Sequence, residues 1–307
     1  MILLRPRNSG WQSKATLTRR FNDTPDGSAV QRVALSTLGT LLALAGFVIP
    51  CTIAMAQESM GPLEEADTTW TNLLKECVVE INDGGGTAVN YDCFAENQST
   101  LNRYLETLSG VDRNAYNTWG RDDQLAYLIN AYNAYTVDLI LDSWPDIESI
   151  RDLGNIVFNS PWKKEFIPLF GETVALDDIE HGMIREAGVF DEPRIHFAVN
   201  CASIGCPALR REAYHGKEID AQLEDQVERF LGDRTRNRFE DGELKVTRLF
   251  KWYRDDFTTG WRGATSVEEF TLLYAEVLGL NEQEAQRLLD GDIDIEYTEY
   301  DWALNGL

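Results

Sequence analysis

The chain has 307 residues, of which 51 are acidic and 28 basic, so its formal net charge is −23. So acidic a protein repels phosphate backbones, and we expect no nucleic-acid partner. Apolar side chains make up 43% of the residues. That is enough for one large domain whose core needs no metal ion or disulfide to fold.

The N-terminus has the pattern of an export signal. Six basic residues precede an uncharged apolar run at 33–56, which ends in the small-residue sequence Ala54-Met55-Ala56. We therefore expect cleavage after Ala56 and a periplasmic or secreted protein. The run is also long enough to span a bilayer, so the alternative is a membrane anchor formed by residues 33–56. Only that alternative gives the protein a membrane partner.

Four cysteines remain after position 56, and an exported protein meets oxidising conditions. Cys77 and Cys93 flank a glycine-rich turn, and a disulfide that closes this turn is plausible. Cys201 and Cys206 are also close enough in sequence to pair. Pairing there blocks any nucleophile, so the redox state of all four cysteines stays open at this point.

The first predicted elements follow the expected cleavage site. Residues 57–69 are polar and indicate a linker, whereas 70–81 favour a helix that ends at the glycine-rich turn. We treat 57–97 as an N-terminal extension and 98–307 as the main domain. Residues 122–144 predict a long helix that is apolar on nearly every side, which is typical of a central buried helix. Its Asn130 and Asn133 need hydrogen-bond partners there.

The rest of the chain mixes short strands and helices. The predicted order is a hairpin (166–170 and 173–176), a helix (177–187), a strand (195–199), a helix (217–231), a strand (243–249), two helices (266–278 and 281–289) and a strand (293–300). Because helices and strands do not alternate regularly, we expect an α+β domain with a small, mostly antiparallel sheet.

Cys201 is the candidate nucleophile. It follows the predicted strand and opens a loop of small residues that ends at Pro207, and backbone N–H groups in such a loop suit an oxyanion. A thiol reacts as the thiolate and needs a neighbouring imidazole. His196 lies five residues before Cys201, so strand alternation places the two side chains on opposite faces. His181 is therefore the preferred base; a structural His196 and a buried structural Cys201 are the alternatives.

Glu180 falls close to the buried side of the helix predicted at 177–187. One explanation is a capping box with Asp177, in which the glutamate reaches back to the first turn. His181 projects to a flank, with Arg185 one turn later. Adjacent helical residues diverge by about 100°, so Glu180 need not orient His181. The three histidines have no metal-ligand spacing, and we expect neither a metal nor a cofactor.

Several segments together resemble the family catalogued as domain of unknown function 547. They cover roughly 98–307, and the matching stretches are Asn130-Ala-Tyr-Asn133-Ala-Tyr, Trp162-Lys-Lys-x-Phe166, Leu176-Asp-Asp-Ile-Glu180-His181-Gly-Met-Ile-Arg185, Pro193 to Cys201 with Cys206-Pro207, and Tyr300-Asp301-Trp302-x-Leu304-Asn305. The resemblance implies a fold similar to cysteine-peptidase and transglutaminase-like domains. It also implies a site made of Glu180, His181 and Cys201.

These observations lead to one main hypothesis and two rivals. The main one is an exported thiol hydrolase or acyl transferase that acts on an amide bond of a peptide or cell-wall fragment, with Cys201 as nucleophile and His181 as base. Residues that support this site are His196, Asn130, Asn133, Arg185 and Lys164. Asn130 or Asn133 orients the imidazole, and Lys164 either receives a substrate carboxylate or is merely solvated. The rivals are a non-catalytic peptide- or protein-binding domain with a peptidase-like groove, and a redox role for Cys201 and Cys206.

Overall fold

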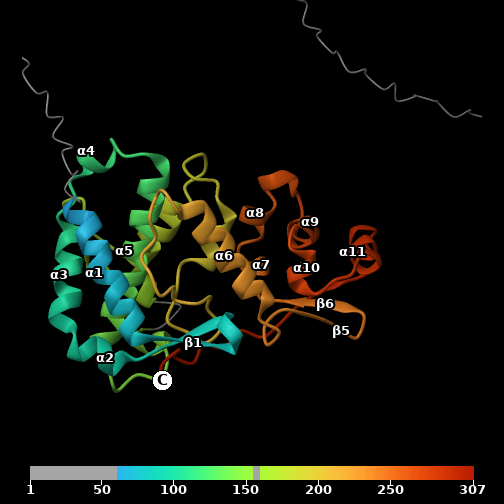
Figure 1. Ribbon diagram of the computed structural model, residues 1–307, viewed down its shortest axis with the longest axis horizontal. Helices are drawn as coiled ribbons and strands as arrows, with labels where there is room; N and C mark the ends of the chain where they lie inside the picture. Colours follow the sequence, from blue (N-terminus) through green and yellow to red (C-terminus); the bar gives the residue numbers. More distant parts are fainter. Residues whose placement is uncertain (1–60, 155–159) are drawn as a thin grey trace, which may run out of the picture. The chain divides into compact units, whose positions relative to one another are not determined.

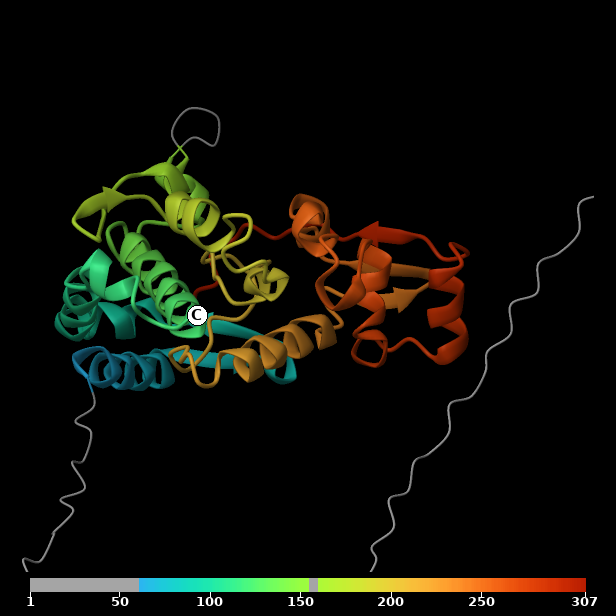
Figure 2. The same cartoon turned by 90° about the horizontal axis from the view of Figure 1, so that it is seen from above.

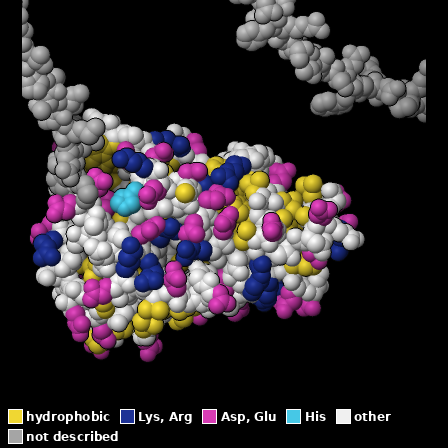
Figure 3. Space-filling model, viewed as in Figure 1, with side chains coloured by type: hydrophobic (Ala, Val, Ile, Leu, Met, Phe, Trp, Pro, Cys, Tyr) yellow, Lys and Arg dark blue, Asp and Glu magenta, His cyan; other side chains and the backbone are white. Residues whose placement is uncertain are grey.

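The computed structural model of the chain describes residues 61–154 and 160–307. All of them belong to one compact unit, 57–307. The predicted export segment and its cleavage site lie outside the described residues. Among the helices that are described, none is long and apolar enough to cross a bilayer. Acidic and basic side chains are interspersed on the face shown in Figure 3, so the acidic excess is not one patch there.

The N-terminal part is helical from its first described residues. Its elements are α1 (Pro62–Cys77), β1 (Val78–Ile81), β2 (Gly86–Val89), α2 (Tyr91–Glu96), α3 (Gln98–Ser109) and α4 (Arg113–Tyr116). The predicted linker is wrong from Pro62 onward, because a proline in the first turn followed by Glu64 and Glu65 is a favourable helix start. The helix predicted at 70–81 ends at Cys77, where β1 begins and pairs antiparallel with β2.

Helix α5 (Arg121–Leu141) is the central helix that the sequence predicts. Fifteen of its 21 residues are buried, because α2, α3 and α6 all pack against it (Figure 1). The segment treated as an extension shares this core: Trp70 of α1 stacks on Tyr104 of α3 at 5.3 Å between ring centroids. The N-terminal helices and α5 therefore form one packed region.

In the middle of the chain, the predicted hairpin is confirmed and the strand predicted at 195–199 is wrong. β3 (Ile167–Leu169) and β4 (Glu172–Val174) pair as predicted. Residues Asp178–Ile184 form a π-helical segment, and α6 spans Ile219–Gly232. The strand predicted at 195–199 is instead a 3-10 helix, Pro193–Phe197. A short apolar run is compatible with either a strand or a buried helical turn. Here Pro193 begins the helical turn, and the side chain of Glu192 caps it by accepting a hydrogen bond from the Arg194 N–H.

The C-terminal part has its own small sheet and its own core. β6 (Glu243–Val246) pairs antiparallel with β5 (Arg238–Glu240) and parallel with β7 (Ile295–Tyr297). The helices between them are α7 (Leu249–Trp252), α8 (Arg254–Phe257), α9 (Val267–Leu272), α10 (Ala275–Leu278) and α11 (Glu282–Leu289). The expected single sheet is thus three separate ones in the described chain, two of them hairpins. The α+β class stands.

The buried apolar side chains of the described chain form two hydrophobic clusters, one around α5 and the other between α6 and the C-terminal helices. Figure 2 shows the elements from β5 to β7 beside the α5 region, with the last residues of the chain running back to it. That return is held by backbone hydrogen bonds, among them Asn305 N–H to Ala202 O (3.1 Å) and Leu304 N–H to Glu148 O (2.7 Å). The chain's end thus ties the two regions together.

Candidate functional site

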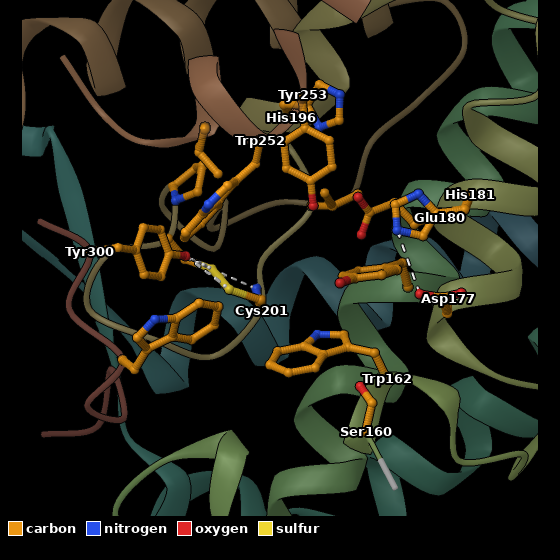
Figure 4. Close-up of a pocket in the computed structure, with 16 residues that line it drawn as sticks. Ser160, Trp162, Asp177, Glu180, His181, His196, Cys201, Trp252, Tyr253 and Tyr300 are labelled. Carbon is orange, nitrogen blue, oxygen red and sulfur yellow. Dashed lines mark hydrogen bonds and ion pairs between the residues drawn. A yellow bond between two sulfur atoms is a disulfide. The ribbon is translucent and has the colours of Figure 1, made fainter. Parts of the chain in front are cut away.

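A pocket of about 230 Å³ lies where the two hydrophobic clusters meet. Figure 4 shows its side chains converging from α5, the π-helical segment, the loop after Cys201, α7 and the C-terminal segment. The lining residues are Tyr132, Ser160, Trp162, Asp177, Glu180, His181, His196, Val199, Cys201, Cys206, Pro207, Leu249, Trp252, Tyr253, Tyr300 and Trp302. The structure therefore brings the predicted Glu180, His181, His196 and Cys201 to one cavity.

The loop that carries Cys201 is fixed by residues distant in sequence. The Ile204 N–H donates to Ala303 O and the Gly205 N–H to Asp301 O, both at 2.8 Å. The Arg236 guanidinium donates to Cys206 O (2.8 Å) and Ile204 O (2.9 Å). Inside this loop Ala202 has a φ of 60°, a left-handed conformation that strains a residue with a side chain. Such strain persists only where the surrounding contacts enforce it.

Cys201 and Cys206 form a disulfide. The sulfur of Cys201 also lies 3.1 Å from the Tyr300 hydroxyl and 3.3 Å from the Ser203 hydroxyl, and Tyr300 OH donates to Cys206 Sγ at 3.2 Å. Burial raises the pKa of Tyr300, so its phenol keeps its proton and remains a donor. Cys201 is thus bonded to sulfur and faces hydroxyl groups rather than an imidazole.

The backbone amides of this loop do not form the oxyanion site that the sequence predicts. The Cys201 N–H donates to Cys206 Sγ (2.9 Å), and the Ala202 N–H donates to Asn200 Oδ1 (3.0 Å). The Cys206 N–H donates to Ser203 O (3.0 Å). These amides hold the loop's own shape, so they are not free for a substrate oxygen.

His196 is buried and belongs to a different set of contacts. Its Nε2 lies 2.6 Å from Asp256 Oδ2, and its ring stacks on Tyr253 at 3.8 Å between centroids. Burial lowers the pKa of His196 and outweighs the opposite effect of its hydrogen bond to Asp256. The Nδ1 atom has no hydrogen-bond partner among the described residues. The argument from strand alternation does not apply here, because the backbone is helical and both His196 and Cys201 line the pocket.

His181 lies at the half-exposed edge of the pocket. Its Nε2 is 3.5 Å from Asp177 Oδ1, and its Nδ1 contacts the guanidinium of Arg185. Arg185 in turn donates to both oxygens of Asp256, at 2.6 and 3.1 Å. Burial favours the neutral acid at Asp256, yet hydrogen bonds from His196 and Arg185 hold the pKa of Asp256 well below its usual range. The hydrogen bonds of both imidazoles thus go to carboxylates and Arg185, and none joins His181 to Cys201.

Glu180 is only 6% exposed, and its Oε1 has no hydrogen-bond partner in the described chain. It faces Tyr132 and Tyr253, and burial together with the negative charge of Glu180 raises the pKa of both phenols. The capping-box explanation is wrong: Glu180 makes no capping hydrogen bond, and the Ala175 N–H is bound by Asp178 Oδ2 at 2.8 Å instead. Capping therefore does not account for a buried carboxylate here.

The two asparagines of α5 bind backbone rather than an imidazole. Asn130 exchanges two hydrogen bonds of 2.8 Å with Tyr214, and Asn133 binds Ala198 O (3.0 Å) and the Asn200 N–H (2.8 Å). Both amides thus have the partners that burial demands. Asn133 positions the chain that leads to Cys201, and Asn130 holds the segment around Tyr214 that follows it.

Lys164 lies outside the pocket, where its Nζ is 3.4 Å from Asp142 and near the ring of Phe166. No lysine or arginine lines the pocket within the described ranges. The same residues contain no cluster of three or more metal-ligating side chains. The lining is acidic and aromatic, and histidine supplies its only basic groups.

Four residues of the site were not predicted as functional. Asp256 lies 60 positions after His196, and no local pattern marks it. Trp252 ends the short helix α7 and Tyr253 follows it directly, and no local motif marks either residue. Tyr300 had a signal, because it begins the C-terminal stretch that carries part of the family resemblance.

Comparison with known proteins is informative for one segment. Residues 116–231 match the family described as "Protein of unknown function, DUF547". No curated protein matches the chain, and no solved structure does. The matched segment includes Glu180, His181, His196, Cys201 and Cys206, but ends before Asp256 and Tyr300. The resemblance seen in the sequence is thus confirmed at residues 116–231, the segment that matches the DUF547 family.

Proposed function

We propose that the pocket is the ligand-binding site of a domain that works with its Cys201–Cys206 disulfide closed. One observation carries this proposal: the sulfur of Cys201 is bonded to Cys206, while the cavity beside it stays open and lined by side chains from five parts of the chain. A small molecule or the side chain of a peptide is the size of ligand that such a cavity takes. This function is the first of the two rivals raised by the sequence, a non-catalytic peptide- or protein-binding domain with a peptidase-like groove.

The two disulfides also support an exported protein, periplasmic or secreted, because such bonds persist in oxidising compartments. Cleavage after Ala56 and anchoring by residues 33–56 both remain compatible with that location. In either case the pocket meets ligands outside the cytoplasm.

Thiol counting combined with a binding screen tests this function. Protein isolated from an oxidising compartment without reductant is treated with iodoacetamide, and peptides are mapped by mass spectrometry. We expect no labelling at Cys77, Cys93, Cys201 or Cys206. Ligands are then screened by tryptophan fluorescence, with Trp252→Phe to assign the signal to the pocket. A free Cys201 that labels below pH 7 contradicts the binding proposal and favours catalysis.

A thiol hydrolase or acyl transferase is the second candidate, favoured by the placement of Cys201, His181 and Glu180 on one cavity. A thiol reductant must first open the Cys201–Cys206 bond. Cys201 then attacks a carbonyl carbon, its proton passes through His181 to the leaving amine, and water hydrolyses the thioester. Tyr300 and Ser203 lie where they can donate hydrogen bonds to the thiolate. The cysteine-peptidase-like fold implied by the family resemblance belongs to this proposal.

Reduced protein tests the second candidate directly. We expect Cys201→Ala to abolish turnover of a p-nitrophenyl ester probe, and Cys206→Ala to retain it, since only the first variant removes the nucleophile. His181→Ala lowers the rate of iodoacetamide labelling at Cys201. Equal turnover in the two cysteine variants rules out Cys201 as nucleophile.

A further inference from the structure

The pocket combines aromatic walls with a buried carboxylate. Six of its lining side chains are aromatic: Tyr132, Trp162, Trp252, Tyr253, Tyr300 and Trp302. Three of them pack closely on one side, with ring centroids 4.9 Å apart for Trp252 and Tyr300 and 4.6 Å for Tyr300 and Trp302 (Figure 4). Ring faces carry partial negative charge and attract cations.

The charge of Glu180 has no neighbouring cation to compensate it fully. The charge of Glu180 acts on the guanidinium of Arg185, but Arg185 donates its carboxylate hydrogen bonds to Asp256 rather than to Glu180. Burial favours the neutral form of His196, so this ring adds no positive charge. Asp177, which also lines the pocket, has His181 as its ion-pair partner.

A buried carboxylate oxygen without a hydrogen-bond partner is costly, and a ligand that completes its contacts is one explanation for such an atom. The phenols of Tyr132 and Tyr253 interact with Glu180, yet its Oε1 atom has no hydrogen-bond partner in the described chain, and Glu180 lines the cavity. The pocket therefore has a negative group in need of a partner, walls that attract cations, and no lysine or arginine along the described lining.

We propose that this pocket binds an organic ammonium group, held between the aromatic side chains and the carboxylate of Glu180. The inference rests on the proposed binding function and names the chemical class of its ligand. Sugars also stack on aromatic rings, but a sugar leaves the charge of Glu180 uncompensated, and that charge decides in favour of a cation. The overall negative charge of −23 adds attraction for cations at longer range.

Choline and its uncharged isostere, in which carbon replaces the quaternary nitrogen, test this inference on the full disulfide-closed protein. We expect choline to change tryptophan fluorescence in a saturable way and to bind at least about tenfold more tightly than the isostere. Glucose serves as the neutral sugar, and we expect it to bind no better than the isostere. Equal affinity for choline and the isostere overturns the inference, and so does tighter binding of glucose.

Variants assign the binding to Glu180. Glu180→Gln is expected to lower choline affinity about tenfold while raising the melting temperature, because it removes a buried charge without full compensation. Glu172→Gln removes an exposed carboxylate on β4, outside the pocket, and should change neither. Trp252→Ala should also weaken choline binding. An unchanged affinity in Glu180→Gln contradicts the inference even if choline binds.

The failures of the two proposals are distinguishable. If the pocket binds an uncharged or anionic compound from the fluorescence screen but not choline, the cation inference fails and the binding function stands. If no compound of any charge binds to the folded, oxidised protein, both fail.

Discussion

The two disulfides of this chain lie in contrasting regions. Cys77–Cys93 joins the end of α1 to α2 and closes the β1–β2 hairpin, with Cys77 completely buried in the core. Cys201 and Cys206 are five positions apart, and their disulfide closes a short loop beside an open pocket, with the Tyr300 hydroxyl near both sulfurs. Each bond pairs a buried cysteine with a partly exposed one, so exposure alone does not separate them.

The surroundings of the two bonds do separate them. The first sits among apolar side chains, and Asp67, the buried acid of α1, accepts a hydrogen bond from Tyr104 at 2.8 Å. The second borders the open pocket, which Glu180 also lines with an Oε1 that has no hydrogen-bond partner in the described chain. Backbone strain does not distinguish the two bonds, because Asn82 and Asp83 in the turn closed by the first disulfide have positive φ values (52° and 54°), as Ala202 does. The open cavity beside the second bond indicates instead that the first disulfide stabilises the fold and that the second shapes a site.

Removing each bond is the strongest test of this contrast. Cys77→Ser with Cys93→Ser opens a span of 16 residues and should lower the free energy of unfolding by about 3 kcal/mol. Cys201→Ser with Cys206→Ser opens a span of 5 and should cost about 2 kcal/mol. Urea unfolding measures both. Only the second pair should alter ligand binding at the pocket, and a binding defect in the first pair would break the comparison.

Asp67 provides a pH test of the N-terminal region. Burial raises its pKa from 3.8 to about 6, although Tyr104 and His215 favour the charged form. The folded state therefore holds its proton more tightly than the unfolded state, and stability is lost as the pH rises from about 4 to about 6. The free energy of unfolding of Asp67→Asn, relative to the unmodified chain, should rise by about 3 kcal/mol between pH 3.5 and 7.5. Glu76→Gln, at an exposed position of the same helix, should show no such change.

Gly205 tests how tightly the pocket loop is held. A Cβ atom at this position would lie 2.9 Å from ring carbons of Tyr300 and 3.0 Å from Asp301 O. Gly205→Ala should lower the free energy of unfolding by about 2 kcal/mol and weaken binding at the pocket by displacing Tyr300. Gly182→Ala is the matched control, because a Cβ there meets no atom within 4 Å. If the two variants behave alike, Tyr300 is not held by this contact.

The smallest expected effect concerns the rate of reduction. A hydrogen bond from the Tyr300 hydroxyl stabilises the thiolate that leaves when dithiothreitol attacks the Cys201–Cys206 bond. Tyr300→Phe should slow that reduction about tenfold, equivalent to about 1.4 kcal/mol, and leave the reduction of Cys77–Cys93 unchanged. Mass spectrometry of quenched samples follows the two bonds separately. Equal slowing at both bonds would show a global effect rather than a local one.

The sequence determined those elements whose pattern is local. The apolar residues of α5 recur on nearly every side of the helix, so its burial could be predicted from the sequence. The hairpin around Gly171 could be predicted as well, because its turn depends on neighbouring residues. The family resemblance likewise depends on short motifs, and it implied three of the residues that line the pocket, Glu180, His181 and Cys201, whereas His196 was a candidate because it lies close to Cys201 in sequence. Where the local pattern was short, as at 195–199, it failed to distinguish a strand from a helical turn.

Only the tertiary structure decided the chemistry around those residues. The partner of Cys201 is Cys206 rather than a histidine, and the partner of His196 is Asp256, because packing the C-terminal region against α6 brings that carboxylate to the buried ring. The lack of a hydrogen-bond partner at Glu180 Oε1 is equally a property of the fold, since it depends on which distant side chains reach the cavity. Hydrogen bonds and desolvation act between neighbours in space, and a linear sequence does not state who those neighbours are.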